Sequence, residues 1–458
     1  MDIDSLLHQY QKSYYSLPRG VKTFFGSLYG NIPLSVRFGK HYNIHKKILE
    51  KYENSNDQFK LDFQFNKTVE TLQFAKDHIP YYQELFSKYS FPIESFKDFR
   101  DLDKLPKLTK EIIQKEKLRL YTDKFDKVAE YSTGGSSSVP MKTYAPLSIS
   151  RAKEKIYMNA SFEKIKYRYR DRAVALNARG NIDENKGIYW DYQLIDNYLL
   201  LSVNHLTQTY IETMLEEIRK WKPKIFYGYP SAIALFIRTC KAIGVESIPN
   251  IEGLVLTSES ISWEDVKLIK AFFNATVISH YGHTERVISA YRRDLEDYYF
   301  YGSYGLVKII DNEMVGTSFD NIVMPYINYS TKDYVGKTTY YPGTNIAKSV
   351  SSLMGRLQEC VITKENMAIP LLSIGAGHFA SFDNVENAQF YQDKPGEVTL
   401  RIVTRHPENI NIQYIIAQMK KQVDNKIDFK IEFVDKIENT TMGKKILCIQ
   451  KLNIDNYK

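Results

Sequence analysis

Ile225-Phe226-Tyr227-Gly228-Tyr229-Pro230-Ser231 is the stretch that decides the fold class of this chain. A short run of β-favouring residues meets a glycine and a proline, and Ser231 is placed to start a helix at residues 232–243. The same strand-then-helix order recurs in the surrounding chain, with strands expected at 173–177, 253–256 and 275–279 and helices at 148–165, 208–221 and 262–273. This alternation predicts an α/β fold with a mostly parallel sheet, whose ligands gather in loops beyond the carboxyl ends of the strands.

The length of the chain indicates more than one domain. At 458 residues it exceeds what a single hydrophobic core usually holds. Near the end of the chain a strand is expected at 397–403, a helix at 408–423 and a strand at 427–434. These elements predict a small α+β unit that follows the larger α/β part.

The charge and cysteine content exclude several classes of protein. The net charge of +8 is spread along the chain, which fits an anionic small substrate or surface and is weak evidence for nucleic acid. Cys240, Cys360 and Cys448 lie far apart among apolar residues, so we expect buried thiols without a zinc site or disulfide framework. No apolar stretch resembles a signal peptide or a bilayer-spanning segment, so we expect a soluble, cytoplasmic protein. The oligomeric state stays open.

A run of glycines and hydroxyls occupies residues 131–142, Tyr-Ser-Thr-Gly-Gly-Ser-Ser-Ser-Val-Pro-Met-Lys. Glycine lets the backbone approach a ligand, and hydroxyls and N–H groups donate to phosphate oxygens. The run is neither a Walker sequence nor a dinucleotide-binding fingerprint. A polyphosphate-binding loop and a flexible linker are therefore the two interpretations that the residues leave open.

Three further loops carry polar side chains. Residues 280–285, His-Tyr-Gly-His-Thr-Glu, follow an expected strand, and residues 324–333 end in Lys332-Asp333. A third loop, Asn-Thr-Thr-Met-Gly-Lys-Lys, occupies residues 439–445. Taken singly, Glu285 could be a surface acid, Asp333 a turn cap and Lys444 a solvated lysine.

In this order the loops resemble the motif series of the adenylate-forming superfamily of acyl-CoA synthetases, luciferases and nonribosomal adenylation domains. Within it, the chain is most similar to the phenylacetate–CoA ligase branch and its CapK-like capsular polysaccharide members. The similarity covers roughly residues 65–450 and rests on nine segments: HIPYYQELF (78–86), LPKLTKE (105–111), STGGSSSVP (132–140), KPKIFYGYPSA (222–232), TSES (257–260), YGHTE (281–285), PYINYSTKD (325–333), GRLQE (355–359) and TTMGKK (440–445).

The resemblance implies a large ATP- and acid-binding domain, residues 1–354, and a small mobile domain, residues 355–458, that swings about a hinge near Gln358. It implies ATP, Mg²⁺ and a carboxylic acid as ligands, with coenzyme A as an alternative acceptor. The residues implied to bind the nucleotide are Thr133, Gly134, Gly135, Ser136, Ser137, Ser258, Glu259, Tyr281, Gly282, Asp333 and Arg356.

Individual roles follow from the same resemblance. Tyr281 would stack on adenine, and Asp333 would accept hydrogen bonds from the ribose hydroxyls. Thr284 would contact the α-phosphate, and Glu285 would help to bind Mg²⁺, a cation that prefers oxygen ligands. Lys444 would reach the α-phosphate and the carboxylate as they react.

The acid is expected to lie near four residues, His205, Tyr229, Pro230 and His283, although a structural histidine is the stronger interpretation of His205. The sequence also departs from the family pattern. Ser138 stands where the phosphate loop usually has glycine, Lys332 replaces the glycine of Thr-Gly-Asp, and Gln358-Glu359 replaces an Asp-Asp hinge.

The expected function is an ATP-dependent, AMP-forming ligase that activates a carboxylic acid as an acyl adenylate. The acyl group would pass to an amine or hydroxyl in surface polysaccharide or natural-product assembly. An acid–CoA ligase that uses coenzyme A is the first alternative. A non-catalytic nucleotide- or acyl-binding scaffold is the second, motivated by Ser138 and Lys332.

Overall fold

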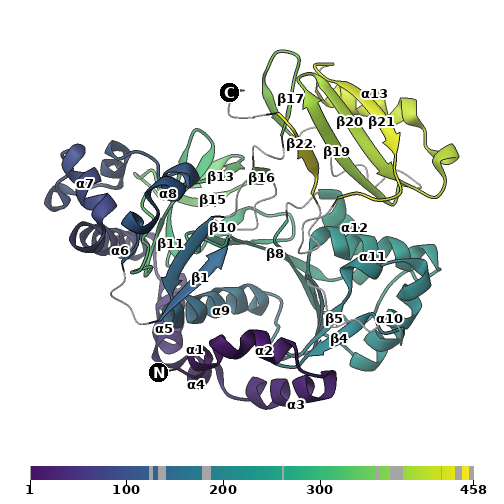
Figure 1. Ribbon diagram of the computed structural model, residues 1–458, viewed down its shortest axis with the longest axis horizontal. Helices are drawn as coiled ribbons and strands as arrows, with labels where there is room; N and C mark the ends of the chain where they lie inside the picture. The colour runs from purple at the N-terminus through teal and green to yellow at the C-terminus, as the bar shows by residue number, and fades with distance from the viewer. Residues whose placement is uncertain are drawn as a thin grey trace. The chain divides into compact units, whose positions relative to one another are not determined.

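The computed structural model describes residues 2–122, 127–132, 141–177, 187–259, 263–356, 360–371, 385–423, 425–438 and 446–452 (Figure 1). The chain divides into two compact units. The first unit comprises residues 1–164 and 279–353, and the second comprises residues 165–278 and 354–458. The sequence predicts a boundary at 354/355 instead, and that boundary stays a prediction.

The first unit begins with helices. Their bounds are α1 (Ile3–Leu7), η1 (His8–Tyr10), α2 (Gln11–Tyr15), α3 (Arg19–Gly30), α4 (Leu34–Arg37), α5 (Gly39–Glu53), α6 (Asp57–His78), α7 (Pro80–Lys88), η2 (Ile93–Ser95), η3 (Phe99–Lys104), α8 (Lys110–Glu116), η4 (Lys117–Leu120) and α9 (Leu147–Glu163). Local signals set several ends. Asn56 caps α6 by accepting from the N–H of Phe59, and Thr109 caps α8 as the sequence predicts. Pro80 occupies the first turn of α7, where its missing N–H costs nothing.

The strands of the first unit are mainly antiparallel. They are β1 (Val128–Ser132), β2 (Lys142–Pro146), β8 (Thr276–Gly282, which begins in the second unit), β9 (Ser289–Arg293), β10 (Tyr298–Phe300), β11 (Gly305–Ile310), β12 (Glu313–Ser318), β13 (Tyr329–Val335), β14 (Thr338–Tyr340), β15 (Ala347–Val350) and β16 (Leu353–Arg356, of which only Leu353 lies in the first unit). β1 pairs with β2, and β11, β12 and β13 form a meander. β10 lies between β9 and β15, and β14 pairs with β15.

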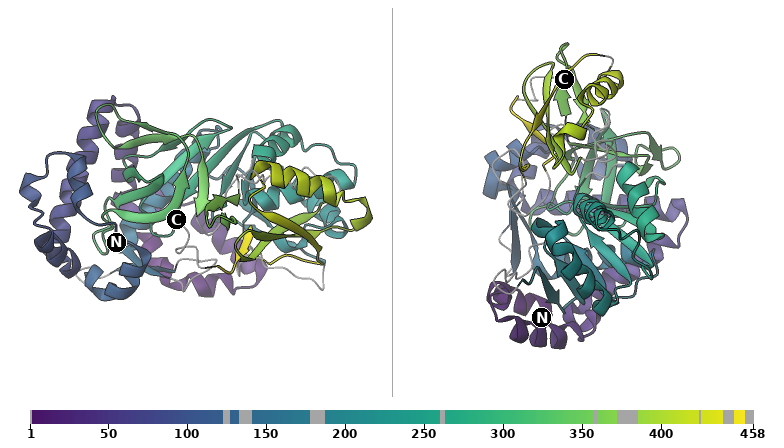
Figure 2. Two further views of the ribbon diagram at one scale, coloured as in Figure 1. Left: turned by 90° about the horizontal axis from the view of Figure 1, so that it is seen from above. Right: turned by 90° about the vertical axis from the view of Figure 1, so that its right-hand side faces the viewer.

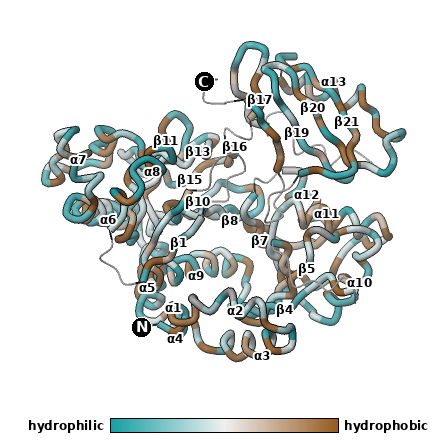
Figure 3. Tube along the Cα trace, in the orientation of Figure 1, coloured by the Kyte–Doolittle hydropathy of each residue, from teal (hydrophilic) through white to brown (hydrophobic). Residues whose placement is uncertain are grey.

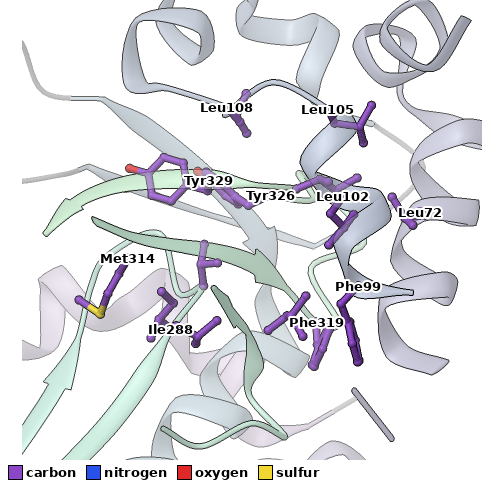
Figure 4. Packing of buried hydrophobic residues seen from close by; sticks show 14 of the residues in the cluster. Leu72, Phe99, Leu102, Leu105, Leu108, Ile288, Met314, Phe319, Tyr326 and Tyr329 are labelled. Atoms are coloured by element: carbon purple, nitrogen blue, oxygen red, sulfur yellow. The ribbon is translucent and has the colours of Figure 1, made fainter. Parts of the chain in front are cut away.

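One apolar core fixes the segment that leads into β13. Leu72 of α6 and Leu102 of η3 are fully buried with Tyr326 of that segment, as Figure 4 shows. The side-chain amide of Asn328 donates to the carbonyl of Leu102 at 2.6 Å, and Tyr82 donates to the carbonyl of Pro325 at 3.0 Å. Because buried polar groups are costly unless bonded, these contacts hold residues 324–329 in one conformation.

A buried ion pair ties α9 to the end of β12. Lys153 is almost fully buried, and its ammonium donates to the carbonyls of Tyr304 and Phe319 at 2.8 and 2.9 Å. It also donates to Asp320 at 3.0 Å. Burial acts to raise the pKa of Asp320, but the charges of Lys153, His45 and Lys67 outweigh it and lower that pKa. Removing Asp320 would leave the buried ammonium of Lys153 without this counter-charge, whereas Asp320 is also paired with Lys67 at 3.2 Å.

The second unit contains the strand–helix alternation that the sequence predicts. Its first part holds β3 (Ala173–Leu176), β4 (Trp190–Gln193), β5 (Tyr198–Leu201), η6 (Val203–His205), α10 (Gln208–Trp221), β6 (Ile225–Gly228), α11 (Pro230–Ala242), β7 (Gly253–Thr257) and α12 (Trp263–Phe273). β5, β3, β6 and β7 are parallel neighbours, and β4 pairs antiparallel with β5 at the edge.

The C-terminal residues of the second unit form an α+β arrangement. Its elements are β17 (Cys360–Ile362), β18 (Ala368–Pro370), β19 (Asn387–Lys394), β20 (Glu397–Val403), η10 (Pro407–Asn409), α13 (Ile412–Gln422), β21 (Asp428–Phe433) and β22 (Cys448–Gln450). The sheet order is β21-β20-β19-β22, and α13 lies against this sheet through Ile415 and Met419 (Figure 2).

The cysteine prediction is confirmed, because Cys240, Cys360 and Cys448 are all buried and unbridged. Burial raises the pKa of Cys240 to about 12, so this thiol stays protonated at neutral pH. Across the described ranges, no helix combines the length and the apolar composition that crossing a bilayer requires.

Gly228 marks the closest backbone approach in the parallel sheet. Its φ of 151° lies outside the range that side-chain-bearing residues readily adopt. A Cβ added there would sit 2.6 Å from the carbonyl carbon of Leu176 on the neighbouring strand. The glycine in the stretch that decides the fold is therefore required by the spacing of β3 and β6.

We expect Gly228→Ala to lower the free energy of unfolding by more than about 2 kcal/mol, because the methyl group meets immovable backbone. Gly20→Ala is the matched control, since nothing lies within 4 Å of a Cβ at that position. The control should be neutral or stabilising by roughly 0.5 kcal/mol. Chemical denaturation measures both, and equal effects of the two substitutions would contradict this explanation.

Candidate active site

The candidate site lies in the first unit, where β8 ends in the turn Tyr281-Gly282-His283-Thr284-Glu285. The N–H of Arg286 donates to the carbonyl of His283 at 3.0 Å and closes the turn. Arg286 has φ 56°, a left-handed conformation that turns the chain sharply after Glu285. The turn therefore presents its polar side chains within a few residues of a strand's carboxyl end, as the sequence predicts.

Tyr281 and Asp333, 52 positions apart, meet directly. The Tyr281 hydroxyl donates to Oδ2 of Asp333 at 2.6 Å. Asp333 is buried, and its N–H donates to Oγ1 of Thr331 at 3.1 Å. The structure thus brings together the two residues that the sequence assigns to adenine and ribose. Their roles toward a nucleotide stay proposals.

His283, Glu285 and Tyr329 form a second hydrogen-bonded set. The N–H of Ile288 donates to Nε2 of His283 at 3.2 Å, so that nitrogen carries the lone pair. The proton of a neutral His283 then lies on Nδ1, which is 3.1 Å from Oε2 of Glu285. The Tyr329 hydroxyl donates to the other oxygen of Glu285 at 2.7 Å. His283, expected near the acid, therefore positions Glu285.

Glu285 is ionised although its side chain is buried. Burial acts to raise its pKa, but the hydrogen bond and the positive charge of His283, together with the hydrogen bond from Tyr329, outweigh burial and lower the pKa to about 2. Glu285 therefore carries its negative charge in a buried position, with a donor on each of its two oxygens. Such a carboxylate suits an added cation.

Mg²⁺ fits this position in one specific way. Among the residues that the structure describes, no three His, Cys, Asp or Glu side chains are grouped to hold a metal. A protein cage for the ion is thus absent from the described ranges. Mg²⁺ commonly binds through one or two carboxylates and the phosphates of a substrate. Glu285 could supply the carboxylate, and the nucleotide phosphates would complete the coordination.

A bulge in β13 sets the position of Asp333. Residues 331–333 stand opposite Met314 alone, between the pairs Glu313–Tyr334 and Val315–Ser330. Lys332, at the centre of the bulge, has φ 60°, a conformation that favours glycine. Its N–H donates to Glu313 at 3.1 Å. Lysine therefore occupies a backbone conformation that favours glycine, the residue expected here from the resemblance.

Glu313 also links the bulge to the LPKLTKE segment. Lys107 donates to Oε2 of Glu313 at 2.8 Å, and Ser330 donates to Oε1. The N–H of Leu108 donates to the carbonyl of Asn328 at 2.9 Å. Two sequence motifs that are more than 200 residues apart thus support each other next to Asp333. Sequence reasoning did not single out Glu313 or Tyr329, because their roles depend on strand register.

The β1–β2 hairpin, whose ends border the hydroxyl-rich run, is anchored on both strands. The guanidinium of Arg286 lies over the ring of Tyr131 in β1, 4.1 Å from its centroid. On β2, the hydroxyl of Tyr326 donates to Oγ1 of Thr143 at 2.6 Å. These contacts fix the described base of the run beside the turn that bears Glu285.

Several predicted residues lie outside the described residues, and their roles stay predictions. These are Thr133, Gly134, Gly135, Ser136, Ser137, Ser138, Gln358, Glu359 and Lys444. Arg356 is described only as backbone at the end of β16.

In the second unit, Glu259 has a local partner. Its carboxylate accepts from the N–H of Ser231 at 3.1 Å, at the start of α11. A negative charge at a helix N-terminus is stabilising. The prediction that Ser231 starts this helix is wrong, because Pro230 is its first residue and the side chain of Ser231 makes no cap. The acceptor comes instead from a residue 28 positions later. Ser258 precedes it with φ 68°.

Aromatic residues surround His205 in the same unit. The His205 ring lies 4.9 Å from that of Tyr189, and Nδ1 is 2.8 Å from the hydroxyl of buried Ser202. Tyr210 packs on Tyr189 at 4.1 Å between ring centroids. These contacts support the structural interpretation of His205. Tyr229 is buried at the end of β6, and burial and the charge of Glu259 raise its pKa.

The C-terminal part of the chain matches a known family. Residues 361–451 match the model of the CapK C-terminal domain. Over 445 residues the chain is 23% identical to Protein CapK of Staphylococcus aureus, and this alignment covers 93% of the chain and 96% of that protein. The chain is CapK-like.

Solved ligase structures share the fold of this CapK-like chain. One is 2-hydroxyisobutyryl-CoA ligase in the postadenylation state in complex with R3-HIB-AMP, with a TM-score of 0.64 at 13% identity over 84% of this chain and 88% of that one. The same enzyme with 2-HIB-AMP and CoA in the thioesterification state gives 0.52 at 12%, over 88% and 92%. The predicted α/β fold class is therefore confirmed, since the chain shares the fold of this ligase.

Glu285 should make stability depend on pH. Its pKa is lower in the folded chain, about 2, than the ordinary value of 4.5. The stabilisation is therefore complete above pH 4.5 and is lost as pH falls toward 2. We expect Glu285→Gln to lower the free energy of unfolding by on the order of 3 kcal/mol at pH 6. The difference in free energy of unfolding between wild type and Glu285→Gln should become smaller below pH 4.5.

Tyr329→Phe provides a graded comparison, because it removes one of the hydrogen bonds to Glu285 and keeps the ring. Its pH dependence should lie between those of wild type and Glu285→Gln. Urea unfolding at several pH values measures all three proteins. If the difference in free energy of unfolding between wild type and Glu285→Gln stayed constant from pH 6 to pH 3, the lowered pKa of Glu285 would be contradicted.

Proposed function

We propose that the protein is an ATP-dependent, AMP-forming ligase that activates a carboxylic acid as an acyl adenylate. The observation that carries the proposal is the direct hydrogen bond between Tyr281 and Asp333, beside a buried, ionised Glu285. The site offers three groups suited to ATP. The aromatic ring of Tyr281 can stack on adenine, the carboxylate of Asp333 can accept from ribose hydroxyls, and the carboxylate of Glu285 can bind a cation. The likeness to adenylate-forming ligases in fold supports the same conclusion.

In the proposed reaction, an oxygen of the acid's carboxylate attacks the α-phosphorus of ATP. A new phosphorus–oxygen bond forms, the bond to the β-phosphate oxygen breaks, and pyrophosphate leaves. Negative charge spreads over phosphate oxygens in the transition state, so positioning and electrostatics provide most of the catalysis. Bound Mg²⁺ would neutralise part of that charge.

The chain's own residues would hold the reactants. Tyr281 would cover the adenine, and Asp333 would accept hydrogen bonds from the ribose while Tyr281 keeps its carboxylate oriented. Thr284 would contact the α-phosphate, and Glu285 would hold the cation. In this proposal the hydroxyl-rich run, residues 133–137, binds the outer phosphates, as its place between the anchored ends of β1 and β2 allows.

The acceptor of the acyl group separates two versions of the proposal. The resemblance of the sequence motifs to CapK-like capsular polysaccharide proteins favours an amine or hydroxyl in surface polysaccharide or natural-product assembly. The likeness in fold to 2-hydroxyisobutyryl-CoA ligase with 2-HIB-AMP and CoA favours a thioester product. Analysis of the acyl product with and without CoA distinguishes them, because both versions release pyrophosphate. A cytoplasmic location fits either version, because ATP and CoA are cytoplasmic metabolites.

Asp333→Asn should lower kcat/KM for ATP at least about tenfold in an acid-dependent ATP–pyrophosphate exchange assay, because amide replaces the charged acceptor for ribose hydroxyls. Asp311→Asn is the matched control, since Asp311 lies in the exposed turn between β11 and β12. The control should behave as wild type. Equal activity of wild type, Asp333→Asn and Asp311→Asn would show that Asp333 does not bind ATP.

Lys444→Ala should reduce the exchange rate on the order of 100-fold or more, as expected when one preorganised donor to the transition state is lost. Lys445→Ala, at the neighbouring lysine, is the control and should retain most of the rate. Exchange dependent on an acid in the wild-type protein would exclude the non-catalytic scaffold. A panel of acids without any exchange would favour that scaffold instead.

A further inference from the structure

The helix α3 presents its apolar side to solvent. Val21, Phe24, Phe25 and Leu28 recur at the spacing of one helical face, and all four are exposed. Phe24 is 60% exposed and Phe25 is 52% exposed. The opposite side of α3 is buried and bears Lys22, Gly26 and Gly30. This order is the reverse of a helix that packs its apolar stripe on a core.

Exposed apolar side chains are concentrated in this part of the chain. Nine of the seventeen large apolar side chains that are exposed in the described ranges lie within the first 44 residues. Figure 3 shows the hydrophobic colour along α3. We define the N-terminal apolar face as the eight of these residues that lie on α1 to α4: Leu6, Leu7, Tyr10, Val21, Phe24, Phe25, Leu28 and Val36.

Polar contacts hold these short helices together. The hydroxyl of Tyr29 on α3 donates to Asp4 of α1 at 2.9 Å. The guanidinium of Arg37 in α4 lies 4.2 Å from the centroid of the Tyr29 ring, and Tyr14 of α2 donates to the carbonyl of Lys22 at 3.0 Å. The apolar face therefore lies on helices that are joined to one another by polar contacts.

The charge around this face has one sign. From Ser5 to Leu49 the sequence contains no Asp or Glu and seven basic residues: Lys12, Arg19, Lys22, Arg37, Lys40, Lys46 and Lys47. The acids that precede this stretch, Asp2 and Asp4, are both buried, and Asp4 is paired with Arg151. An anionic partner is therefore complementary to this part of the chain.

We propose that the N-terminal apolar face seats the protein on an anionic lipid bilayer. Short amphipathic helices with aromatic and aliphatic residues on one face and basic residues beside them bind in this way, lying in the interface without crossing it. Burial of Phe24, Phe25 and Leu28 supplies the apolar contribution. Exposed Lys40 and Lys47 supply attraction to anionic headgroups, whereas Lys46 is paired with Glu50.

A second copy of the chain is the less favoured occupant. Pairing two of these faces would bring together two acid-free, basic segments, and like charges in apposition are unfavourable. A lipid surface that contains anionic headgroups is complementary to both the exposed apolar side chains and the positive charge of this part of the chain.

Vesicle co-sedimentation of the full-length protein tests this proposal. The probes are vesicles of phosphatidylglycerol mixed with phosphatidylcholine, and vesicles of phosphatidylcholine alone. We expect binding to the anionic vesicles, weaker binding to the neutral ones, and weakening of the former as salt is raised. The double variant Phe24→Ser/Phe25→Ser should bind the anionic vesicles at least about tenfold more weakly.

The double variant Ile412→Ser/Tyr414→Ser is the matched control, because it removes two exposed apolar side chains from α13. It should bind as wild type does, and both double variants should keep the wild-type Tm. Equal binding of Phe24→Ser/Phe25→Ser and wild type would overturn the proposal. So would absence of binding to either vesicle. A wild-type dimer in analytical ultracentrifugation that Phe24→Ser/Phe25→Ser converts to monomer would assign the face to a second copy and overturn it as well.

Discussion

The hydrogen bond from Tyr281 to Asp333 joins the end of β8 to the bulge of β13 and sets the two side chains of the candidate site against each other. Each partner reaches this position for a separate reason. Tyr281 follows a strand whose turn is closed by Arg286, and Asp333 follows Lys332, whose left-handed backbone is held by Glu313. Because neither constraint involves a ligand, the chain itself sets the relation between the two residues. This is preorganisation of the kind that makes electrostatic catalysis effective.

A second constraint acts on charge. Glu285 stays ionised in a buried position because His283 and Tyr329 donate to its two oxygens. The turn thus places an aromatic ring, a hydroxyl and an ionised carboxylate within five consecutive residues. The exposed apolar residues of α3 are not part of this site.

Hydrophobic periodicity predicted the elements whose apolar residues face a core. The strand at 225–228, the helix at 208–221 and the strand at 397–403 were predicted to within a residue or so, because one side of each is buried. The helix α3 was missed, although Val21, Phe24, Phe25 and Leu28 recur at helical spacing. The antiparallel meander β11–β13 was also missed. Motif order predicted Tyr281, Glu285 and Asp333 as site residues, and the structure brings them into one unit.

Tyr329 and Glu313 could not be predicted, because strand register decides which side chains meet. The contact of Glu259 with the N–H of Ser231 at the start of α11 could not be predicted either, because it joins residues that are distant in the sequence.

A crystal structure of the protein with ATP or an acyl-adenylate analogue tests the central claim most directly. We predict the adenine against the ring of Tyr281 and the ribose hydroxyls within hydrogen-bonding distance of Asp333, with the α-phosphate near Thr284. Nucleotide bound elsewhere, with the ring of Tyr281 and the carboxylate of Asp333 in contact only with protein, would contradict the account.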